Sequence, residues 1–340
     1  MSHFSWIKSK TNFNKNQILT NLNKIKNIKS SVYSLQNDAI PVIDLSKCDL
    51  RSSCIQKEIY DIFFDYSGVF IFKGLYSEEI MEKYNQWSEN MLNEIINDKN
   101  KNHPKQKNKF LINDVVERMS QNDPELLIDI VFNKKLNLIM DIMMGFGTIG
   151  SCTGHWIQPW GDRQLSHVDY PMHVGSGKFW ENNVNKLKRL TTKHQINKIL
   201  PFFSFQLLIA SDKMNFINGS TEVVPGSHLI DNLDINIHNK KTYAAFEDHF
   251  INAELDKGDL LIFNRRLCHR GGKNLTKYRR NALIIQCVNL WGIGQELINS
   301  DSVIENIKKC DKYKNLSDTK KNDILLRIKK PYPIDVKNSA

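Results

Sequence analysis

The sequence predicts an α+β fold in which helices pack on a β core. Between residues 55 and 145, apolar side chains recur at helical spacing in several segments. From about residue 148 to 292, short runs rich in β-branched and aromatic residues alternate with turn-forming clusters, as in a sandwich or barrel. Helical sequence followed by a series of strands is typical of one domain in which helices flank an antiparallel sheet.

The chain of 340 residues is long enough for one large domain, which we place at residues 39–340 after a polar, basic leader at 1–38. An organelle-targeting peptide is the alternative interpretation of this leader, although such peptides favour Arg and this one uses Lys. The chain has no secretory signal core and no run of about 18 apolar residues. Its six cysteines form no CxxC pair. We therefore expect a cytoplasmic protein with reduced thiols.

Local patterns define the expected elements of the first half. Ser77 followed by Glu79 opens the clearest helix, and Gly145 ends the last one. The Lys/Asn-rich stretch 96–112 lacks periodicity and predicts a loop. In order, we expect a strand at 39–46, a helix at 55–66, a strand at 67–76, a helix at 77–96 and one or two helices at 124–145.

The second half is expected to hold the β core. A basic insertion at 181–200 interrupts it and is either a lid over a site or a surface loop. The segment from 295 returns to helical, Lys-rich sequence. The expected strands lie in TIGSCTGHWIQP (148–159), RQLSHVDYPMHV (163–174), FFSFQLLIASD (202–212), GSTEVVPGSH (219–228), AELDKGDLLIFN (253–264) and NALIIQCVNLW (281–291).

The stretch SHVDY (166–170) contains two candidate metal ligands. On a strand, His167 and Asp169 point to the same face. A non-haem Fe(II) centre uses two histidines and one carboxylate on one face of the metal, so this pair supplies two of the three ligands. The alternative for His167 is a half-buried strand histidine that donates to Asp169. His173 follows Pro171, past the expected end of the strand, and fits a loop better than a ligand position.

A third ligand and an anion-binding residue occur in KGDLLIFNRRLCHRGGKNLTKYRRNALIIQ (257–286). An apolar strand leads to His269, a Gly-Gly turn follows, and the next strand holds Arg279 and Arg280. Arg280 suits a dicarboxylate cosubstrate that chelates the metal at one end and takes a bidentate Arg pair at the other. Arg279 should face the opposite way.

These segments, taken together, resemble the phytanoyl-CoA dioxygenase family. The residues that carry the resemblance run in order along residues 60–292: DYSGVFIFKGLYSEEIMEKY (65–84), HVD (167–169), NGSTEVVPGSH (218–228), GD (258–259), HRGGKN (269–274) and Arg280. The resemblance implies a double-stranded β-helix (jelly-roll, cupin-like) core flanked by N-terminal and C-terminal helices. It also implies an enzyme that uses Fe(II), 2-oxoglutarate and O₂ and releases succinate and CO₂.

Carried over to this chain, the resemblance makes His167, Asp169 and His269 the catalytic iron ligands. Arg280 would bind the distal carboxylate of 2-oxoglutarate, and His228 would be structural. Two positions depart from the family pattern. Leu208 stands where many members have Trp, and Gly271 stands where many have Ser or Thr. Gln164, three residues before His167, is a further candidate for cosubstrate binding.

The substrate is expected to be a small, carboxylated metabolite of a biosynthetic pathway. The candidate contacts are Trp156, Arg163, Tyr170 and Arg270, which flank the ligand motifs, and the cations among them suit an anion. The presence of Asp169 favours oxygen chemistry, because the carboxylate is absent in relatives that halogenate. Hydroxylation, desaturation and oxidative cyclisation all fit the motifs.

Two alternatives differ in the class of function. The net charge of +10 permits an oxygenase of the same fold that acts on a macromolecule such as nucleic acid. The basic residues are not interleaved with aromatics, however, so we expect no stable nucleic-acid or membrane partner. The other alternative is a catalytically silent jelly-roll binding module, for which Leu208 and Gly271 are the only hints.

Overall fold

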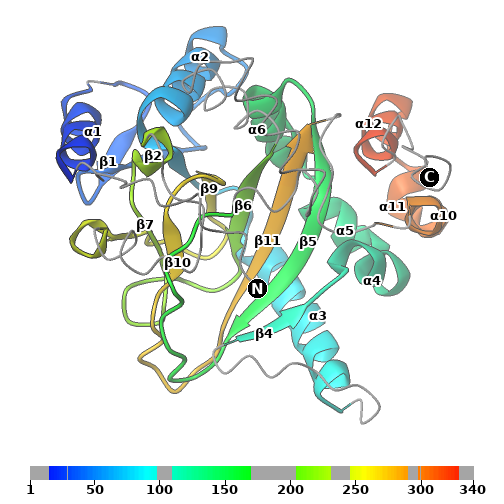
Figure 1. Cartoon of the computed structure of the whole chain (residues 1–340). Helices are drawn as coiled ribbons and strands as arrows, with labels where there is room; N and C mark the ends of the chain where they lie inside the picture. Colours follow the sequence, from blue (N-terminus) through cyan, green and yellow to red (C-terminus); the bar gives the residue numbers. More distant parts are fainter. Residues whose placement is uncertain are drawn as a thin grey trace, which may run out of the picture.

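Two β-sheets form the centre of the protein (Figure 1). The computed structural model describes residues 15–28, 30–97, 109–169, 204–230, 246–289, 298 and 300–328. The larger sheet has the order β1 (Ser34–Gln36), β2 (Ile40–Asp44), β3 (Val69–Lys73), β9 (Leu260–Asn264), β6 (Ser204–Ala210), β11 (Arg280–Asn289), β5 (Gly147–Ile157) and β4 (Lys109–Ile112). The smaller sheet has the order β10 (His269–Gly271), β7 (Thr221–Val223) and β8 (Ile251–Asn252). Every pair is antiparallel except β2 with β3.

Helices cover one face of the larger sheet, and the smaller sheet lies against the other (Figure 1). The helices are α1 (Lys15–Asn27), α2 (Ser53–Ile62), α3 (Glu78–Asn97), α4 (Val115–Asn122), α5 (Pro124–Ile130), α6 (Lys134–Met144), α10 (Ser300–Lys309), α11 (Asp311–Lys314) and α12 (Asp318–Ile328). A π-helical turn, Phe63–Ser67, extends α2. The arrangement confirms the predicted α+β fold. None of the described helices combines the length and apolar character needed to cross a membrane.

Alternation along the strands assigns each side chain to one face of the larger sheet. In β3, Phe70 and Phe72 pack in the cluster beneath the helices, whereas Val69 and Ile71 pack toward the smaller sheet. The same period of two holds in β6, β9 and β11. A phenylalanine buried in this way contributes about 2 kcal/mol. Because both faces are covered, the central strands are nearly continuous apolar runs. The pocket described below lies on the face toward the smaller sheet.

The predicted helices are confirmed, and their boundaries have local causes. The side chain of Asp123 accepts a hydrogen bond from the N–H of Leu126 to cap α5, and Asn133 caps α6. Gly145 ends α6 with a φ of 74°. The prediction of a loop throughout 96–112 was wrong at its end, because Lys109–Ile112 pairs with β5 as the edge strand β4.

The leader expected at 1–38 contributes a helix to the described fold. Ile18 and Ile25 of α1 are fully buried, and Ile18 packs in a cluster with Val224. Asn21 donates from its side chain to the carbonyl oxygen of Gly226 at 3.1 Å. The α1 segment of the predicted leader therefore packs on the core as a helix.

A buried arginine ties the C-terminal helix α12 to the core. Arg327 is 2% exposed and donates to both carboxylate oxygens of Asp141, at 3.0 and 2.8 Å. It also donates to Asp323 at 3.1 Å and to the carbonyl oxygen of Gly147 at 2.6 Å. Such charge-assisted pairs fix geometry as well as adding stability.

We therefore expect Asp141→Ala to lower the free energy of unfolding by about 2–3 kcal/mol, because it leaves a buried guanidinium short of one partner. Urea denaturation measures the change. The exposed Asp318 on α12 is the matched control, with an expected change within about 0.5 kcal/mol. Equal losses in the two variants would contradict this account of α12.

Candidate metal centre and its pocket

Two segments far apart in the sequence bring three metal-binding side chains together. One potential ligand atom from each of His167, Asp169 and His269 lies within 4.8 Å of the other two. The backbone N–H of His167 donates to the carbonyl of His269 at 3.0 Å, and the reverse bond is 2.9 Å. This single bridge replaces the longer strand expected for SHVDY. The N–H of Asp169 donates to the carbonyl of Arg265 at 2.8 Å, which fixes the third side chain beside the bridge.

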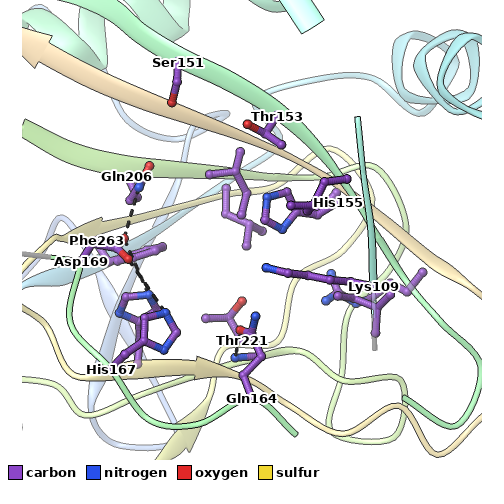
Figure 2. Close-up of a pocket in the computed structure, with 18 of the residues that line it drawn as sticks. Lys109, Ser151, Thr153, His155, Gln164, His167, Asp169, Gln206, Thr221 and Phe263 are labelled. Carbon is purple, nitrogen blue, oxygen red and sulfur yellow. Dashed lines mark hydrogen bonds and ion pairs between the residues drawn. The ribbon is translucent and has the colours of Figure 1, made fainter. Parts of the chain in front are cut away.

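The two imidazoles present their Nε2 atoms to the carboxylate (Figure 2). Nδ1 of His167 lies 2.8 Å from the carbonyl oxygen of Leu165, and Nδ1 of His269 lies 2.9 Å from that of Leu267. Each Nδ1 therefore carries the proton and donates, which leaves the Nε2 lone pair for a ligand. The distances from Nε2 to the oxygens of Asp169 are 3.9 Å for His167 and 3.8 Å for His269.

The protonation states in this cluster suit a cation at neutral pH. Burial would raise the pKa of Asp169, but His269, Arg265, His167 and the hydrogen bond from Gln206 lower it to about 2. Burial lowers the pKa of His269 to about 4, with His167 acting in the same direction. A carboxylate and a neutral imidazole result, so a metal ion does not have to displace their protons.

Asp169 is held by the residues around it. Gln206 of β6 donates from Nε2 to Asp169 Oδ2 at 3.1 Å. Arg265 donates to the backbone carbonyl of Asp169 and to Ser204 Oγ, both at 3.3 Å. These contacts orient the carboxylate toward the histidines.

We expect Gln206→Leu to weaken metal binding about 10- to 100-fold while the fold is kept, because it removes the hydrogen bond that orients Asp169. Anaerobic titration with Fe(II) measures the affinity, and thermal melting of the metal-free protein checks the fold. An unchanged Fe(II) affinity would contradict this role for Gln206.

The triad lies in a pocket between the two sheets, with a volume of about 480 Å³ (Figure 2). The strands place alternate residues on its wall. From β5 these are Ser151, Thr153, His155 and Ile157. The other strand residues are Lys109 and Leu111 of β4, Gln206 and Leu208 of β6, Thr221 of β7, Phe263 of β9, His269 and Gly271 of β10, and Arg280, Ala282 and Ile284 of β11.

Arg280 reaches this pocket as a buried cation. Its guanidinium donates from Nη2 to the Gly219 carbonyl at 3.0 Å and from Nη1 to Met214 Sδ at 3.2 Å. Its Nε has no hydrogen-bond partner, and within the described ranges Arg280 forms no ion pair. Burial lowers the pKa of Arg280 to about 10, so it stays charged at neutral pH. A buried charge without a partner is costly, and an anionic ligand would supply the missing partner.

Lys109 and His155 also line the pocket, and neither was among the predicted site residues. Lys109 points into the cavity from β4 (Figure 2), and burial lowers its pKa. Burial lowers the pKa of His155 well below its usual range, and Lys109 and Arg280 act in the same direction, so this imidazole is neutral. Alternation along 147–157 could have identified His155. No signal in the Lys-rich stretch distinguishes Lys109 from its neighbours.

Gln164 and Leu208 lie on the wall of the same pocket. Oε1 of Gln164 accepts a hydrogen bond from the backbone N–H of Gly271 at 2.7 Å. The two departures noted in the sequence, at 208 and 271, therefore both face the cavity. The predicted structural role of His228 fits its position, because it is buried and its Nε2 lies 3.2 Å from the Phe64 carbonyl oxygen.

Three of the four predicted substrate contacts are not among the residues that line the pocket. Trp156 belongs to the opposite face of β5 from His155, where it is buried and donates from Nε1 to Ser88 Oγ at 2.8 Å. Arg163 pairs with Glu222 at 3.1 Å. Arg270 is buried against the same Glu222 and pairs with Glu247 at 2.7 Å. Neither arginine lines the pocket. Tyr170, His173 and the insertion 181–200 lie outside the described residues.

Comparison with known proteins identifies relatives. A model of the phytanoyl-CoA dioxygenase (PhyH) family matches residues 64–282. The iron/alpha-ketoglutarate-dependent dioxygenase ausU of Aspergillus calidoustus is 32% identical over 74 residues, 22% of each chain. The dioxygenase lolE1 of Epichloe uncinata is 38% identical over 79 residues, 23% of this chain and 30% of that protein. The matches thus span less than a third of these relatives.

A solved structure of similar fold is the epimerase SnoN in complex with Fe3+, alpha ketoglutarate and nogalamycin RO. The TM-score is 0.51 at 10% identity, and the match covers 76% of this chain and 91% of that one. At this identity the likeness shows the fold alone. It agrees with the two-sheet arrangement described above and confirms the predicted jelly-roll core.

Proposed function

The chain belongs to the phytanoyl-CoA dioxygenase family of Fe(II)- and 2-oxoglutarate-dependent oxygenases, and from this premise we propose that it oxidises an unactivated C–H bond of a small metabolite. One observation carries the proposal: His167, Asp169 and His269 share a single pocket with the guanidinium of Arg280, whose buried Nε has no hydrogen-bond partner. A metal ion and a dicarboxylate cosubstrate would use these groups together. The complete triad supports an enzyme over a silent binding module.

The donor set fits iron and the cosubstrate. Two imidazoles and one carboxylate are the ligands of a non-haem Fe(II) centre with open positions. The buried Nε of Arg280 lacks a partner, and a carboxylate would provide one. When bound, Fe(II) and 2-oxoglutarate supply the activation of O₂ and the oxidation of the substrate.

The residues of the chain would bind the metal ion and the cosubstrate, orient them, and exclude water from the pocket. His167 and His269 would hold the ion through Nε2, and Gln206 would keep Asp169 oriented toward it. Arg280 would bind the distal carboxylate of 2-oxoglutarate, and Lys109 adds a second positive charge to the same cavity. The apolar wall residues Leu208, Phe263 and Ile284 limit the access of water to the reacting groups.

The pocket favours a small, anionic substrate. Its volume of about 480 Å³ suits a metabolite and leaves little space for a macromolecule. Arg163 and Arg270 are not arguments for an anionic substrate, because both form ion pairs with Glu222. The charges inside the pocket still favour an anionic substrate. Fe(II), Arg280 and Lys109 would together carry four positive charges, and Asp169 and the dianionic cosubstrate would carry three negative ones. One positive charge would remain. A carboxylated substrate would neutralise it, and hydroxylation, desaturation or cyclisation would each use the same site.

Succinate formation tests the proposal. Fe(II) is loaded anaerobically, 2-oxoglutarate is added, and O₂ is then admitted in the presence of small acids, amino-acid derivatives and acyl-CoAs. We expect succinate to rise with one class of compound. Binding of Fe(II) and 2-oxoglutarate is measured separately by calorimetry. If the protein binds neither, it is not an oxygenase of this type.

A further inference from the structure

One end of the molecule carries a cluster of exposed apolar side chains. Within the described part of the chain, nine large apolar residues are exposed, and five of these lie on three loops, at 158–161, 211–220 and 272–279. We term this cluster the apolar end; its members are Trp160, Phe216, Ile217, Leu275 and Tyr278. Their exposed fractions run from 40% to 66%. Single exposed apolar residues are ordinary, but several gathered on one surface mark an interaction site.

Hydrogen bonds between the three loops hold the apolar end together. Asn274 is fully buried and donates from Nδ2 to the carbonyl oxygen of Gln158 at 3.0 Å. The backbone N–H of Leu275 donates to the carbonyl of Ile217 at 2.7 Å. The loop that contains Asn274 and Leu275 is therefore joined to both of the others. Figure 1 shows the three loops together at the end of the larger sheet where β5 ends and β11 begins.

Trp160 is presented to solvent by a strained backbone. Its φ of 56° lies in the left-handed region, which bulky residues rarely adopt. Its N–H donates to the carbonyl of Thr276 at 3.2 Å, and the N–H of Gly161 donates to that of Gln158 at 3.1 Å, so the turn is fixed. Glycine would adopt this conformation without strain. Neither burial nor backbone preference explains a tryptophan here, and strain of this kind occurs at functional sites.

Positive charges surround the apolar end. Lys277 and Arg279 flank Tyr278 in the sequence, and Nζ of Lys277 lies 5.2 Å from the centroid of the Tyr278 ring. Within the described ranges, neither Lys277 nor Arg279 forms an ion pair. Lys213 and Lys273 lie on the same loops, and each pairs with an aspartate. The surface is thus apolar with a cationic rim.

This combination favours a membrane surface over other occupants. Two copies of the chain would bring the same cations together, and like charges oppose such a contact. Nucleic acid would stack on the aromatic rings, but Ile217 and Leu275 offer it nothing to stack on. Tryptophan and tyrosine beside lysine and arginine are typical of membrane–water interfaces, where the rings lie at the level of the headgroups and the cations meet anionic lipid.

We propose that the apolar end docks this protein on the surface of an anionic membrane. The five apolar side chains enter the interface, and Lys277 and Arg279 contact lipid headgroups. The inference goes beyond the proposed function and does not depend on it. It departs from the expectation of no stable membrane partner, because folding brings aromatics and cations together from three loops. Ile157 and Arg280 adjoin these loops and line the metal-centre pocket, so docking places the pocket beside the membrane.

Co-sedimentation of the full chain with lipid vesicles tests the inference. One set of vesicles is phosphatidylcholine alone, and the other also contains phosphatidylserine. We expect tighter binding to the second set, weakening as salt is added. Trp160→Gly should weaken binding to it by about tenfold or more, because a large aromatic ring is lost from the interface. This variant should melt no lower than the wild type, because glycine relieves the left-handed backbone.

A second variant separates charge from apolar contact. Lys277→Gln should weaken binding to the vesicles with phosphatidylserine by about fivefold and leave binding to phosphatidylcholine unchanged. Leu326→Ser is the matched control. Leu326 is also an exposed apolar residue, but it lies on α12, far from the apolar end (Figure 1). Its replacement should change neither kind of binding.

The outcomes are distinct. Absence of vesicle binding by the wild type would overturn the inference. Equal binding by the wild type and Trp160→Gly would show that the net charge of +10 attracts the chain without the apolar end, and would overturn it too. A dimer, or a complex with a single-stranded oligonucleotide, that forms in place of vesicle binding and is lost in Trp160→Gly would assign the surface to that partner instead. The proposed function is tested separately, because succinate formation is measured without vesicles and Trp160 and Lys277 lie outside the pocket.

Discussion

Replacing His269 with alanine is expected to abolish Fe(II)-dependent oxidation by this protein. His269 contributes one of the two Nε2 atoms that face Asp169, and His155, which also lines the pocket, is not part of the group of potential ligands. Loss of a direct ligand should weaken Fe(II) binding by well over about 100-fold, the upper range for residues that only orient ligands. Anaerobic Fe(II) titration and succinate formation measure the two consequences.

The control for this variant is His249→Ala, because His249 lies outside the pocket and should leave both measurements unchanged. His167→Ala and Asp169→Ala should behave as His269→Ala does. The fold should survive in each case, because the backbone bridge between residues 167 and 269 does not involve side chains. A folded Asp169→Ala variant with full oxygenation activity would show that the triad is not the catalytic centre.

Arg280→Met is expected to have opposite effects on stability and on binding. In the free protein, Arg280 is a buried cation with an unpartnered Nε and no ion pair to a described residue. A methionine of similar length removes that cost, so the melting temperature of the free protein should rise by about 2–4 °C for each kcal/mol gained. Affinity for 2-oxoglutarate should fall at least about 100-fold, because the charged partner of its distal carboxylate is gone.

Arg279→Met provides a matched control, since Arg279 is exposed and precedes Arg280 on the same segment. It should change neither quantity by a measurable amount. Addition of 2-oxoglutarate should raise the melting temperature of the wild type and of Arg279→Met, but not that of Arg280→Met. If Arg280→Met instead melts well below the wild type, Arg280 stabilises the fold of the free protein, and the unpartnered Nε is not evidence for a ligand site.

The sequence was sufficient to predict that His167, Asp169 and His269 lie together, because its signals are local. The i, i+2 spacing of His167 and Asp169, and the strand that precedes His269, each specify a direction for a side chain. Helix caps and the glycine at 145 likewise mark the ends of α5 and α6. These features depend on neighbours along the chain, so they could be predicted without knowledge of the tertiary structure.

The substrate contacts could not be predicted in this way. Trp156 is a predicted contact because it lies on the strand before the HVD motif, but the alternation of β5 places it under the helices and places His155 in the cavity. The ion pairs of Arg163 and Arg270 with Glu222 could not be foreseen, because Glu222 is distant from both in the sequence. Lys109 faces the site only because β4 pairs with β5 at the edge of the larger sheet. Each of these depends on which segments become neighbours in space.

The backbone bridge between His167 and His269 has a consequence for the supply of metal. Two amide hydrogen bonds set the separation of these residues before any ion arrives. The apoprotein therefore keeps a finished site, and binding does not have to fold it. A finished site of nitrogen and oxygen donors prefers Co²⁺, Ni²⁺ and Cu²⁺ to Fe²⁺. We therefore expect these ions to compete with Fe²⁺ for the three side chains.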